Sequence, residues 1–317
     1  MLRYPRSKMI NKKSKIFIAG HNGMVGSAVL RKLKSNNYKN LITIEKKSLN
    51  FLDQKKTKSF LIKKKPDFVV VCAAVVGGIE YNRKYKSKFL YENLQIQNNL
   101  IHGAYLAGVR NLIFLGSSCM YPKKTKTPIN EEQLLTGSPE ETNDAYVLAK
   151  ISGLKLCEFY SKNFKLNYKT LMPCNIYGPG DTYDLKKSHF YPALIKKILL
   201  AKKNKKKFIE IWGSGTPRRE VLHVDDLADA IIYFMNKKIK DYYINIGSGK
   251  EFSIVWYAKF LMKKMGLKFK IKLKKSMPDG VKSKLINSSK ARRYGWKPKI
   301  NLSHGFISTI EDYKLKN

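Results

Sequence analysis

Tyr146 and Lys150 are the two residues of this sequence whose types and spacing are best suited to proton transfer. In an expected helix, side chains four positions apart lie on one face. A free tyrosine hydroxyl has a pKa of about 10, and a neighbouring ammonium group stabilises the phenolate and brings that proton into working range. The pair could therefore exchange a proton with a substrate carbonyl oxygen.

Spacing alone does not single out this pair. The same spacing recurs in this lysine-rich chain at Tyr4 and Lys8, Tyr183 and Lys187, and Tyr233 and Lys237. Only the Tyr146 pair follows a strand-like segment that ends Gly116-Ser117-Ser118. A hydroxyl at the carboxyl end of such a strand could bind a substrate carbonyl. The alternative is a tyrosine and a lysine on a solvated helix face.

Gly20, Gly23 and Gly26 form a G-x-x-G-x-x-G pattern between an apolar strand and a helix beginning near Met24. A tight turn, close approach of backbone N–H groups to a pyrophosphate, and close packing of helix on strand each favour glycine. The pattern is weak alone, but its place at the first strand-to-helix turn predicts a dinucleotide-binding loop. An ordinary turn is the alternative.

The end of the second expected strand, LITIEKK, leaves the type of dinucleotide open. Glu45 is placed to bind the ribose hydroxyls of NAD, whereas Lys46 or Lys47 could bind the 2′-phosphate of NADP. Solvated loop charges are the remaining interpretation of these residues.

Cys119, His189 and His223 are further candidates whose position alone is a weak signal. A cysteine just after a strand is more often a small buried hydrophobic residue than a catalytic base. His223 is expected to organise the start of a helix through Asp225. Since no Cys, His and Asp ligands cluster with metal-site spacing, no metal site is expected.

Alternating segments from residue 15 onward predict the elements that must hold these residues. Short apolar runs alternate with longer amphipathic ones, which is typical of parallel βαβ units. The expected helices lie near 24–36, 54–64, 87–107 and 144–164; the expected strands are KIFIAG, LITIE, a buried segment within 68–79, NLIFLGSS and YKTLMPCNIYG. The fold class expected is α/β, a doubly wound parallel Rossmann sheet with a smaller C-terminal α/β substrate-binding lobe.

The chain is expected to divide into a tail and two domains. The expected divisions are a loose basic tail at 1–14, a dinucleotide-binding Rossmann domain at 15–178 to which the chain returns around 221–250, and a substrate-binding lobe formed by 179–220 and 251–317; the family resemblance given below implies that the dinucleotide is NADP.

Composition narrows the class of protein. The formal net charge is +40, but its lysines are spread along the chain without a nucleic-acid-binding motif, so no nucleic-acid partner is expected. No apolar run is long enough to span a bilayer and no signal peptide is recognised, so no membrane partner is expected. The four cysteines, Cys72, Cys119, Cys157 and Cys174, are widely separated, which fits a reducing cytoplasm.

Several segments, taken in order, resemble the GDP-L-fucose synthase family of extended short-chain dehydrogenases. They are KIFIAGHNGMVGSA, AAVVGGI, NLIFLGSSCMYP, Tyr146-x-x-x-Lys150, MPCNIYGPGD, SHFYPALI, WGSGTPRREVLHVDD and INIGSG. The resemblance runs from about residue 15 to the C-terminus. It implies epimerisation of GDP-4-keto-6-deoxy-D-mannose at C3 and C5, followed by reduction of the C4 ketone with NADPH. A cytoplasmic homodimer is expected, with helices 87–107 and 144–164 at its interface.

By this resemblance, Cys119 is the base and His189 the acid of epimerisation, while Ser117, Tyr146 and Lys150 serve the reduction. NADP is the expected cofactor, with NAD less favoured. The residues expected to contact it are Gly20, His21, Asn22, Gly23, Met24, Val25, Gly26, Lys46, Leu115, Gly116, Ser117, Ser118, Lys150, Pro173, Cys174, Asn175, Ile176 and His189. The residues expected to bind the GDP-sugar are Lys197, Trp212, Arg219 and Asp279.

Departures from the family pattern keep other functions open. Lys197 stands where arginine is expected, Val75 where lysine is frequent, and Val221 where phenylalanine is usual. One alternative is a related GDP-deoxyhexose or GDP-heptose 4-reductase without full epimerase activity. A second is a non-catalytic Rossmann protein that binds a nucleotide or nucleic acid, suggested by the charge.

Overall fold

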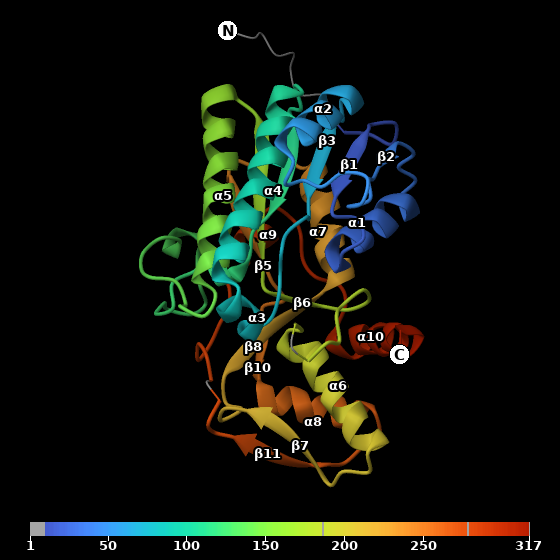
Figure 1. The fold of residues 1–317 in the computed structure, drawn as a ribbon, viewed down its shortest axis with the longest axis vertical. Helices are drawn as coiled ribbons and strands as arrows, with labels where there is room; N and C mark the ends of the chain where they lie inside the picture. Colours follow the sequence, from blue (N-terminus) through green and yellow to red (C-terminus); the bar gives the residue numbers. More distant parts are fainter. Residues whose placement is uncertain (1–9, 186, 278, 317) are drawn as a thin grey trace.

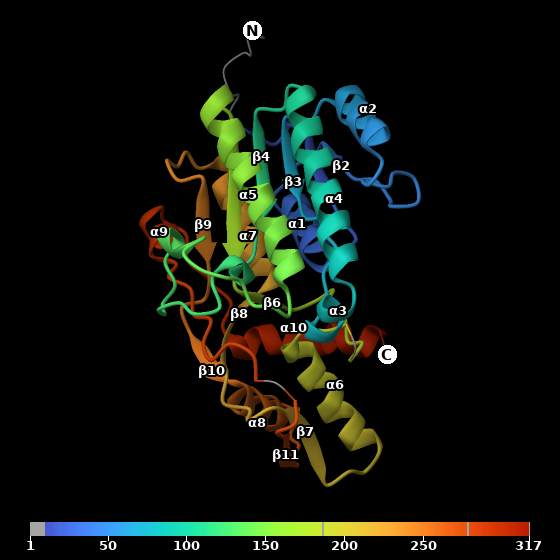
Figure 2. The same ribbon diagram turned by 60° about the vertical axis from the view of Figure 1, so that its left-hand side comes forward.

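A six-stranded parallel sheet organises the larger part of the computed structural model, which describes residues 10–185, 187–277 and 279–316. The strand order is β2-β1-β3-β4-β5-β9 (Figure 1 and Figure 2). These strands are β1 (Ile16–Ala19), β2 (Leu41–Ile42), β3 (Phe68–Val71), β4 (Asn111–Leu115), β5 (Asn167–Pro173) and β9 (Tyr243–Ile246). The expected α/β Rossmann fold is confirmed.

Hydrophobic residues cover both faces of this sheet because successive strand side chains point in opposite directions. In β1, Ile16 and Ile18 enter one core, whereas Phe17 and Ala19 enter the other. Helices α1 and α7 pack together on the first face, and α2, α4 and α5 pack on the second (Figure 2). The bounds are α1 (Met24–Ser35), α2 (Gln54–Lys64), α4 (Lys86–Leu106), α5 (Asp144–Phe164) and α7 (Val224–Asn236).

Side chains at the N-cap positions fix where two of these helices begin. The Asp53 carboxylate accepts a hydrogen bond from the Lys56 backbone N–H at 2.9 Å and caps α2. His223 Nδ1 accepts from the Asp225 N–H at 3.2 Å and caps α7. His223 therefore organises the start of a helix, as its sequence context predicts.

A second lobe lies next to the carboxyl ends of the large sheet's strands (Figure 1 and Figure 2). Its three-stranded sheet, β10-β8-β6, and its two-stranded sheet, β11-β7, enclose a separate apolar core with α6 and α8. The strands are β6 (Asn175–Tyr177), β7 (Phe208–Trp212), β8 (Arg218–His223), β10 (Glu251–Ser253) and β11 (Lys270–Lys274). The helices are α6 (Phe190–Lys203), α8 (Ile254–Lys264) and α10 (Leu302–Lys316), while α3 (Ile79–Lys84) packs on α4 and α9 (Ser289–Arg293) packs on β9.

Three expected segments differ in detail from the structure. The expected strand LITIE is paired only at Leu41–Ile42, because the chain then turns, and the Glu45 carbonyl accepts from the backbone N–H groups of Ser48 and Leu49. The buried run beginning at Phe68 is a strand only to Val71. YKTLMPCNIYG divides between two sheets, β5 and β6.

The expected tail at 1–14 lies mostly outside the described residues. Its last residues form a turn in which Ser14 N–H donates to the Asn11 carbonyl, and the Lys12 carbonyl accepts from Lys39 N–H. In the part of the chain that the structure describes, no helix is long and apolar enough to cross a membrane.

Candidate active site

The glycine loop joins β1 to the first turn of α1. Gly20 has a φ of +88°, and a Cβ there would lie 2.7 Å from the Ala73 backbone nitrogen. A Cβ on Gly26 would overlap the Gly20 carbonyl, so α1 packs directly on the loop. The Cβ position of Gly23 meets only the Gly20 carbonyl oxygen, at 3.5 Å. The loop backbone and the α1 N-terminus thus form a cradle that fits a pyrophosphate.

A cavity of about 230 Å³ opens beside the glycine loop. Its walls include the loop, the chain after β2, the end of β3 and one side of α4. Phe51, Leu52 and Ile96 supply apolar surface, and Lys46 supplies a cation. An apolar slot with a cation beside a pyrophosphate cradle fits the adenosine half of a phosphorylated dinucleotide.

Glu45 and Lys46, which the sequence leaves as alternatives, have different surroundings. Glu45 accepts a hydrogen bond from Asn22 Nδ2 at 2.7 Å and lies 3.4 Å from His21 Nε2. Its carboxylate is thereby tied to the side chains of the glycine loop. Lys46, by contrast, lines the cavity itself.

Ser117 begins the turn after β4 and holds its hydroxyl in a defined orientation. Its Oγ accepts a hydrogen bond from the Cys119 backbone N–H at 3.1 Å and so caps the short 3-10 helix Ser118–Met120. The hydroxyl oxygen thus acts as an acceptor within the protein, which leaves the hydroxyl hydrogen available for a carbonyl oxygen. Helix α5 packs against this short helix and brings Tyr146 toward it.

Lys150 is buried beneath the active-site turn. Its Nζ donates to the Leu115 carbonyl at 2.8 Å and lies 4.5 Å from the centre of the Phe114 ring. The distance from Nζ to the Tyr146 ring centre is 5.8 Å. Burial lowers the pKa of Lys150 to about 8, and Cys72 and Cys157 act in the opposite direction. The lysine therefore still carries its charge at pH 7.

Tyr146 keeps its proton in this environment. Burial raises its pKa above the ordinary value, and the nearby Cys119 adds to that effect, so the lowered pKa expected from the spacing of Tyr146 and Lys150 is not found. A protonated phenol is the form needed to donate a proton to a ketone oxygen as the ketone is reduced. The Lys150 charge then stabilises the phenolate that remains.

Cys119 is half-buried and lies among charged and polar groups from three other segments. Lys284 Nζ is 3.9 Å from its sulphur. Arg219 of β8 and Tyr146 of α5 are also within electrostatic range. The site is therefore more polar than that of a structural cysteine, which contradicts the interpretation drawn from position alone.

His189 immediately precedes α6 and is its N-cap residue. The segment before it is held by residues 75–78, here called the VVGG loop. Gly78 N–H donates to the Lys187 carbonyl at 2.8 Å. A Cβ on Gly78 would lie 2.6 Å from the Ser188 carbonyl oxygen. His189 is exposed to solvent on one side, but the surrounding protein atoms desolvate its ring and lower its pKa.

The four residues expected to bind a GDP-sugar fall into two groups. Lys197 Nζ lies 5.2 Å from the Trp212 ring centre and donates to the Glu210 carbonyl at 3.0 Å. The Asp279 carboxylate accepts from the Ser214 N–H at 2.6 Å. Trp212 ends β7, immediately before the turn that holds Ser214, so the groups meet in one region of the second lobe.

Arg219 is tied to the same segment as Asp279. Its Nη1 donates to the Arg218 and Val281 carbonyls, both at 2.7 Å. A Cβ on Gly280 would lie 3.4 Å from its Nη2. The guanidinium is thus fixed in orientation while part of its fork remains directed at the loop after Asp279.

Pro173 to Ile176 lie where the chain leaves the large sheet for the second lobe. Pro173 ends β5 and Asn175 begins β6. Asn175 Nδ2 donates to the Glu220 backbone carbonyl at 3.1 Å. Cys174 is buried, which raises the pKa of its thiol, so it is not a nucleophile at neutral pH.

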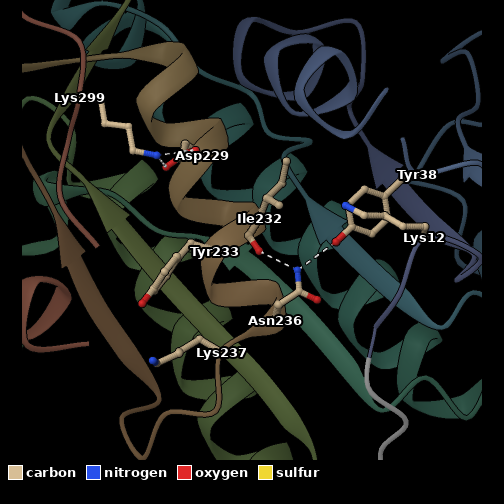
Figure 3. A pocket seen from close by; sticks show the side chains of 8 residues that line it. All are labelled: Lys12, Tyr38, Asp229, Ile232, Tyr233, Asn236, Lys237 and Lys299. Carbon is tan, nitrogen blue, oxygen red and sulfur yellow. Dashed lines mark hydrogen bonds and ion pairs between the residues drawn. The ribbon is translucent and has the colours of Figure 1, made fainter. Parts of the chain in front are cut away.

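A larger cavity, of about 410 Å³, lies beside α7 and holds none of the described residues assigned a role above (Figure 3). Asn236 donates to the Tyr38 hydroxyl at 3.0 Å, and Lys299 pairs with Asp229 at 3.2 Å. The polar groups that line this cavity are bonded to one another, and the candidate catalytic and cofactor-binding residues lie elsewhere. We therefore place the active site at the glycine loop. The described residues contain no group of His, Cys, Asp or Glu that could hold a metal ion.

Comparison with known families identifies this combination of loop, turn and second lobe. Residues 16–247 match the family model described as the NAD dependent epimerase/dehydratase family. The chain belongs to this family.

Named relatives make the comparison more specific. The chain is 44% identical over 307 residues to a putative GDP-L-fucose synthase 2 of Arabidopsis thaliana, covering 97% of this chain and 94% of that protein. It is 40% identical over 308 residues to the GDP-L-fucose synthase of Escherichia coli K12, covering 94% and 96%. The resemblance stated from the sequence motifs is confirmed.

Solved structures agree in fold over nearly the whole chain. A GDP-6-OMe-4-keto-L-xylo-heptose reductase from C. jejuni has a TM-score of 0.91 at 33% identity and covers 98% of this chain and 100% of its own. A GDP-L-fucose synthetase from Naegleria fowleri bound to NADP has a TM-score of 0.89 at 25% identity, covering 98% and 95%.

Three features of the site have no clear signal in the sequence. They are the approach of Lys284 to Cys119, the docking of the VVGG loop before His189, and the buried carboxylate of Glu220. VVGG belongs to a motif that the family resemblance includes, but its role emerges only from the contact. The other two depend on pairings across long stretches of chain, which local patterns do not reveal.

Proposed function

We propose that this protein converts GDP-4-keto-6-deoxy-D-mannose to GDP-L-fucose by epimerisation at C3 and C5 and reduction of the C4 ketone with NADPH. The observation that carries the proposal is the turn after β4, which presents Ser117 and Cys119 beside Tyr146. A substrate ketone bound at this turn would be close to two hydroxyl groups that can donate to its oxygen and to a thiol that can remove a proton from a neighbouring carbon.

In the epimerisation half, the C4 ketone acidifies the hydrogens on C3 and C5. The Cys119 thiolate takes a carbon-bound proton, the C–H electron pair passes into the enolate, and the Ser117 hydroxyl stabilises the enolate oxygen. Protonated His189 returns a proton to the other face and becomes neutral. Because desolvation lowers the pKa of His189, its protonated form depends on the negative charge that develops in the substrate.

In the reductive half, Ser117 and Tyr146 hold the C4 carbonyl oxygen, and Tyr146 gives it a proton. NADPH, when bound, supplies the hydride to C4. Lys150 stabilises the resulting tyrosinate from below, and its link to the Leu115 carbonyl fixes it under the turn. The glycine loop would hold the pyrophosphate of this cofactor.

Binding of the GDP-sugar is assigned to the second lobe. Trp212, 40% exposed, offers a ring face, while Lys197 and Arg219 offer positive charge for the diphosphate. Lys197 keeps the charge of an arginine but lacks its planar fork, and its Nζ donates to the Glu210 backbone carbonyl.

NADPH is the proposed reductant in preference to NADH. Lys46 lines the cavity of the adenosine half, whereas Glu45 is bonded to Asn22. A lysine there favours a ribose carrying a 2′-phosphate.

The proposed assembly is a cytoplasmic homodimer formed through α4 and α5. These adjacent helices expose Tyr91 (62%), Leu148 (50%) and Phe159 (53%). Exposed apolar side chains on two packed helices favour burial against a second copy. Light scattering of the parent protein and of Phe159→Glu measures the mass; a parent monomer would contradict the assembly.

A related GDP-heptose or GDP-deoxyhexose 4-reductase is the second candidate function. The similarity to the C. jejuni heptose reductase, at 33% identity and a TM-score of 0.91, favours it. That enzyme class would need the Tyr146 and Lys150 set but not the carbon acid–base chemistry of Cys119. Configuration at C3 and C5 of the product distinguishes the two functions.

The direct test is incubation of the purified protein with GDP-4-keto-6-deoxy-D-mannose and NADPH. We expect NADPH oxidation that depends on the sugar, and none in Tyr146→Phe. If the parent protein consumes no NADPH with this sugar, the proposed function is wrong.

The role of Cys119 has its own test. In heavy water, Cys119→Ser is expected to retain reduction of the ketone while losing deuterium incorporation at C3 and C5. Unchanged incorporation would refute the assignment of Cys119 as the base.

A further inference from the structure

Lys284 is a half-buried neighbour of Cys119 to which no role has been assigned so far. It lies in the segment that follows Asp279, 165 positions along the chain from Cys119, and its Nζ is 3.9 Å from the cysteine sulphur. An ammonium group at this distance from a sulphur stabilises the thiolate over the thiol.

The segment that carries Lys284 is held on one side by Glu220. This carboxylate is fully buried; one oxygen accepts from the Ile286 N–H at 3.0 Å and the other from the Gly249 N–H at 2.6 Å. Ile286 is two residues beyond Lys284, so the bond fixes the backbone close to the lysine. Glu220 thus ties β8, the turn before β10 and this segment together.

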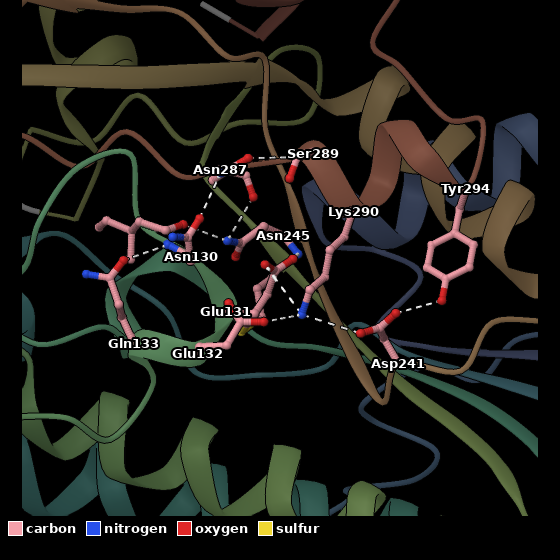
Figure 4. A network of polar contacts seen from close by, with 12 residues as sticks. Asn130, Glu131, Glu132, Gln133, Asp241, Asn245, Asn287, Ser289, Lys290 and Tyr294 are labelled. Carbon is pink, nitrogen blue, oxygen red and sulfur yellow. Dashed lines mark hydrogen bonds and ion pairs between the residues drawn. The ribbon is translucent and has the colours of Figure 1, made fainter.

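The same segment is held on its other side by the chain around Ile129. Ile129 N–H donates to the Leu285 carbonyl, and Asn287 N–H donates to the Ile129 carbonyl, both at 2.8 Å. Figure 4 shows how the network continues from Asn287 and Asn245 to Glu131 and Lys290. With hydrogen bonds on both sides, the backbone at residues 285–287 has little freedom to move Lys284 away from the sulphur.

Arg219 is a second cation near Cys119, and its charge also acts on the sulphur, but its hydrogen bonds go to backbone carbonyls. Its Nη1 donates to two backbone carbonyls, those of Arg218 and Val281. Lys284, in contrast, directs its ammonium at the sulphur. Tyr146 also faces Cys119, and its retained proton leaves it without charge.

We propose that Lys284 is the cation that stabilises the Cys119 thiolate, and that Glu220 is a positioning residue that holds Lys284 in place. This inference rests on the proposed function, in which the thiolate removes a proton from C3 or C5. Cys119 becomes a thiol in that step and the C–H electron pair enters the enolate, while Lys284 exchanges no proton.

The pH profile of thiol alkylation tests the inference on the intact protein. The rate of iodoacetamide labelling is measured as a function of pH in the parent protein, Lys284→Met and Lys282→Met. The labelling of a Cys119→Ser protein is subtracted from each profile. Lys282 is an exposed lysine two residues away and serves as the matched control. The subtraction removes labelling of the other cysteines. Cys72 contributes little to it, because burial raises the pKa of its thiol to about 12.

In Lys284→Met, the midpoint of Cys119 alkylation is expected to rise by about one pH unit or more, which slows labelling at pH 7 about tenfold. Lys282→Met should retain the parent midpoint. Glu220→Gln should give a smaller rise, because the lysine remains but its segment is less firmly held.

Two results would overturn the inference. One is a midpoint in Lys284→Met that moves no further than in Lys282→Met. The other is a rise in the KM for the GDP-sugar with an unaltered alkylation profile, which would make Lys284 a substrate-binding residue. Since labelling needs no substrate, failure of the proposed function would leave this measurement intact and is recognised separately by the absence of sugar-dependent NADPH oxidation.

Discussion

Replacing Lys150 by methionine removes the positive charge beneath Tyr146 while keeping a long apolar side chain. The Nζ of Lys150 lies 5.8 Å from the Tyr146 ring centre. For unit charges at that separation, an effective dielectric constant of about 20 gives an attraction of about 3 kcal/mol. If this attraction is felt fully by the tyrosinate, the hydride-transfer step should slow by about 100-fold.

Single-turnover oxidation of bound NADPH at pH 7 measures this step. NADPH affinity is determined separately, so that lost binding is not mistaken for lost chemistry. Lys155→Met is the matched control, because Lys155 lies on the same helix but pairs with Glu158 at 2.9 Å. A Lys150→Met rate within about threefold of the parent, less than about 1 kcal/mol, would refute the electrostatic role.

The pKa of Lys150 adds a second check on the same variant. Burial lowers that pKa to about 8, so the charge is present below this pH and is lost above it. The parent's advantage over Lys150→Met should therefore shrink as the pH rises through about 8. An advantage that is constant from pH 7 to pH 9 would show that the lysine charge is not the cause.

The remaining predictions concern cofactor binding and stability. Lys46→Glu should weaken NADPH binding by at least about tenfold and remove its preference over NADH, measured by titration; equal parent affinities would contradict this. Gly26→Ala should lower both Tm and NADPH affinity, because the added Cβ would overlap the Gly20 carbonyl. Gly23→Ala should lower NADPH affinity with little change in Tm, because its Cβ position is open. Similar Tm losses in the two variants would refute the packing argument. Burial raises the pKa of Glu220 to about 7, so this residue's stabilising effect is greatest at low pH and is lost between about pH 4.5 and 7. The free energy of unfolding of the parent relative to Glu220→Gln should fall over that interval by on the order of 3 kcal/mol in urea titrations; a flat difference would contradict it.

Local patterns in the sequence were sufficient for the nucleotide-binding half of the fold. Helix α1 begins at Met24, directly after the glycine loop, and α5 spans the expected residues, because glycines and apolar spacing act over a few positions. Pairing at a sheet edge was less predictable: β2 ends at Ile42, since the chain turns at Glu45 and leaves β1.

The second lobe and the details of the site depend on contacts between distant segments. Strand β11 pairs with β7, which lies some sixty residues earlier in the sequence. The hydrophobic periodicity of the two segments does not predict that pairing. Similarly, the position of Cys119 suggested a buried hydrophobic residue until family resemblance gave it a role. Its contact with Lys284 became visible only when the fold had brought residue 284 to the turn.

Product analysis by NMR is the measurement that tests the central claim most directly. The parent protein is incubated in heavy water with GDP-4-keto-6-deoxy-D-mannose and NADPH, and the isolated GDP-sugar is examined. The account predicts GDP-L-fucose with inverted C3 and C5, each carrying deuterium, and a reduced C4. A reduced product that retains the original C3 and C5 configuration and contains no deuterium would contradict the account and identify a 4-reductase.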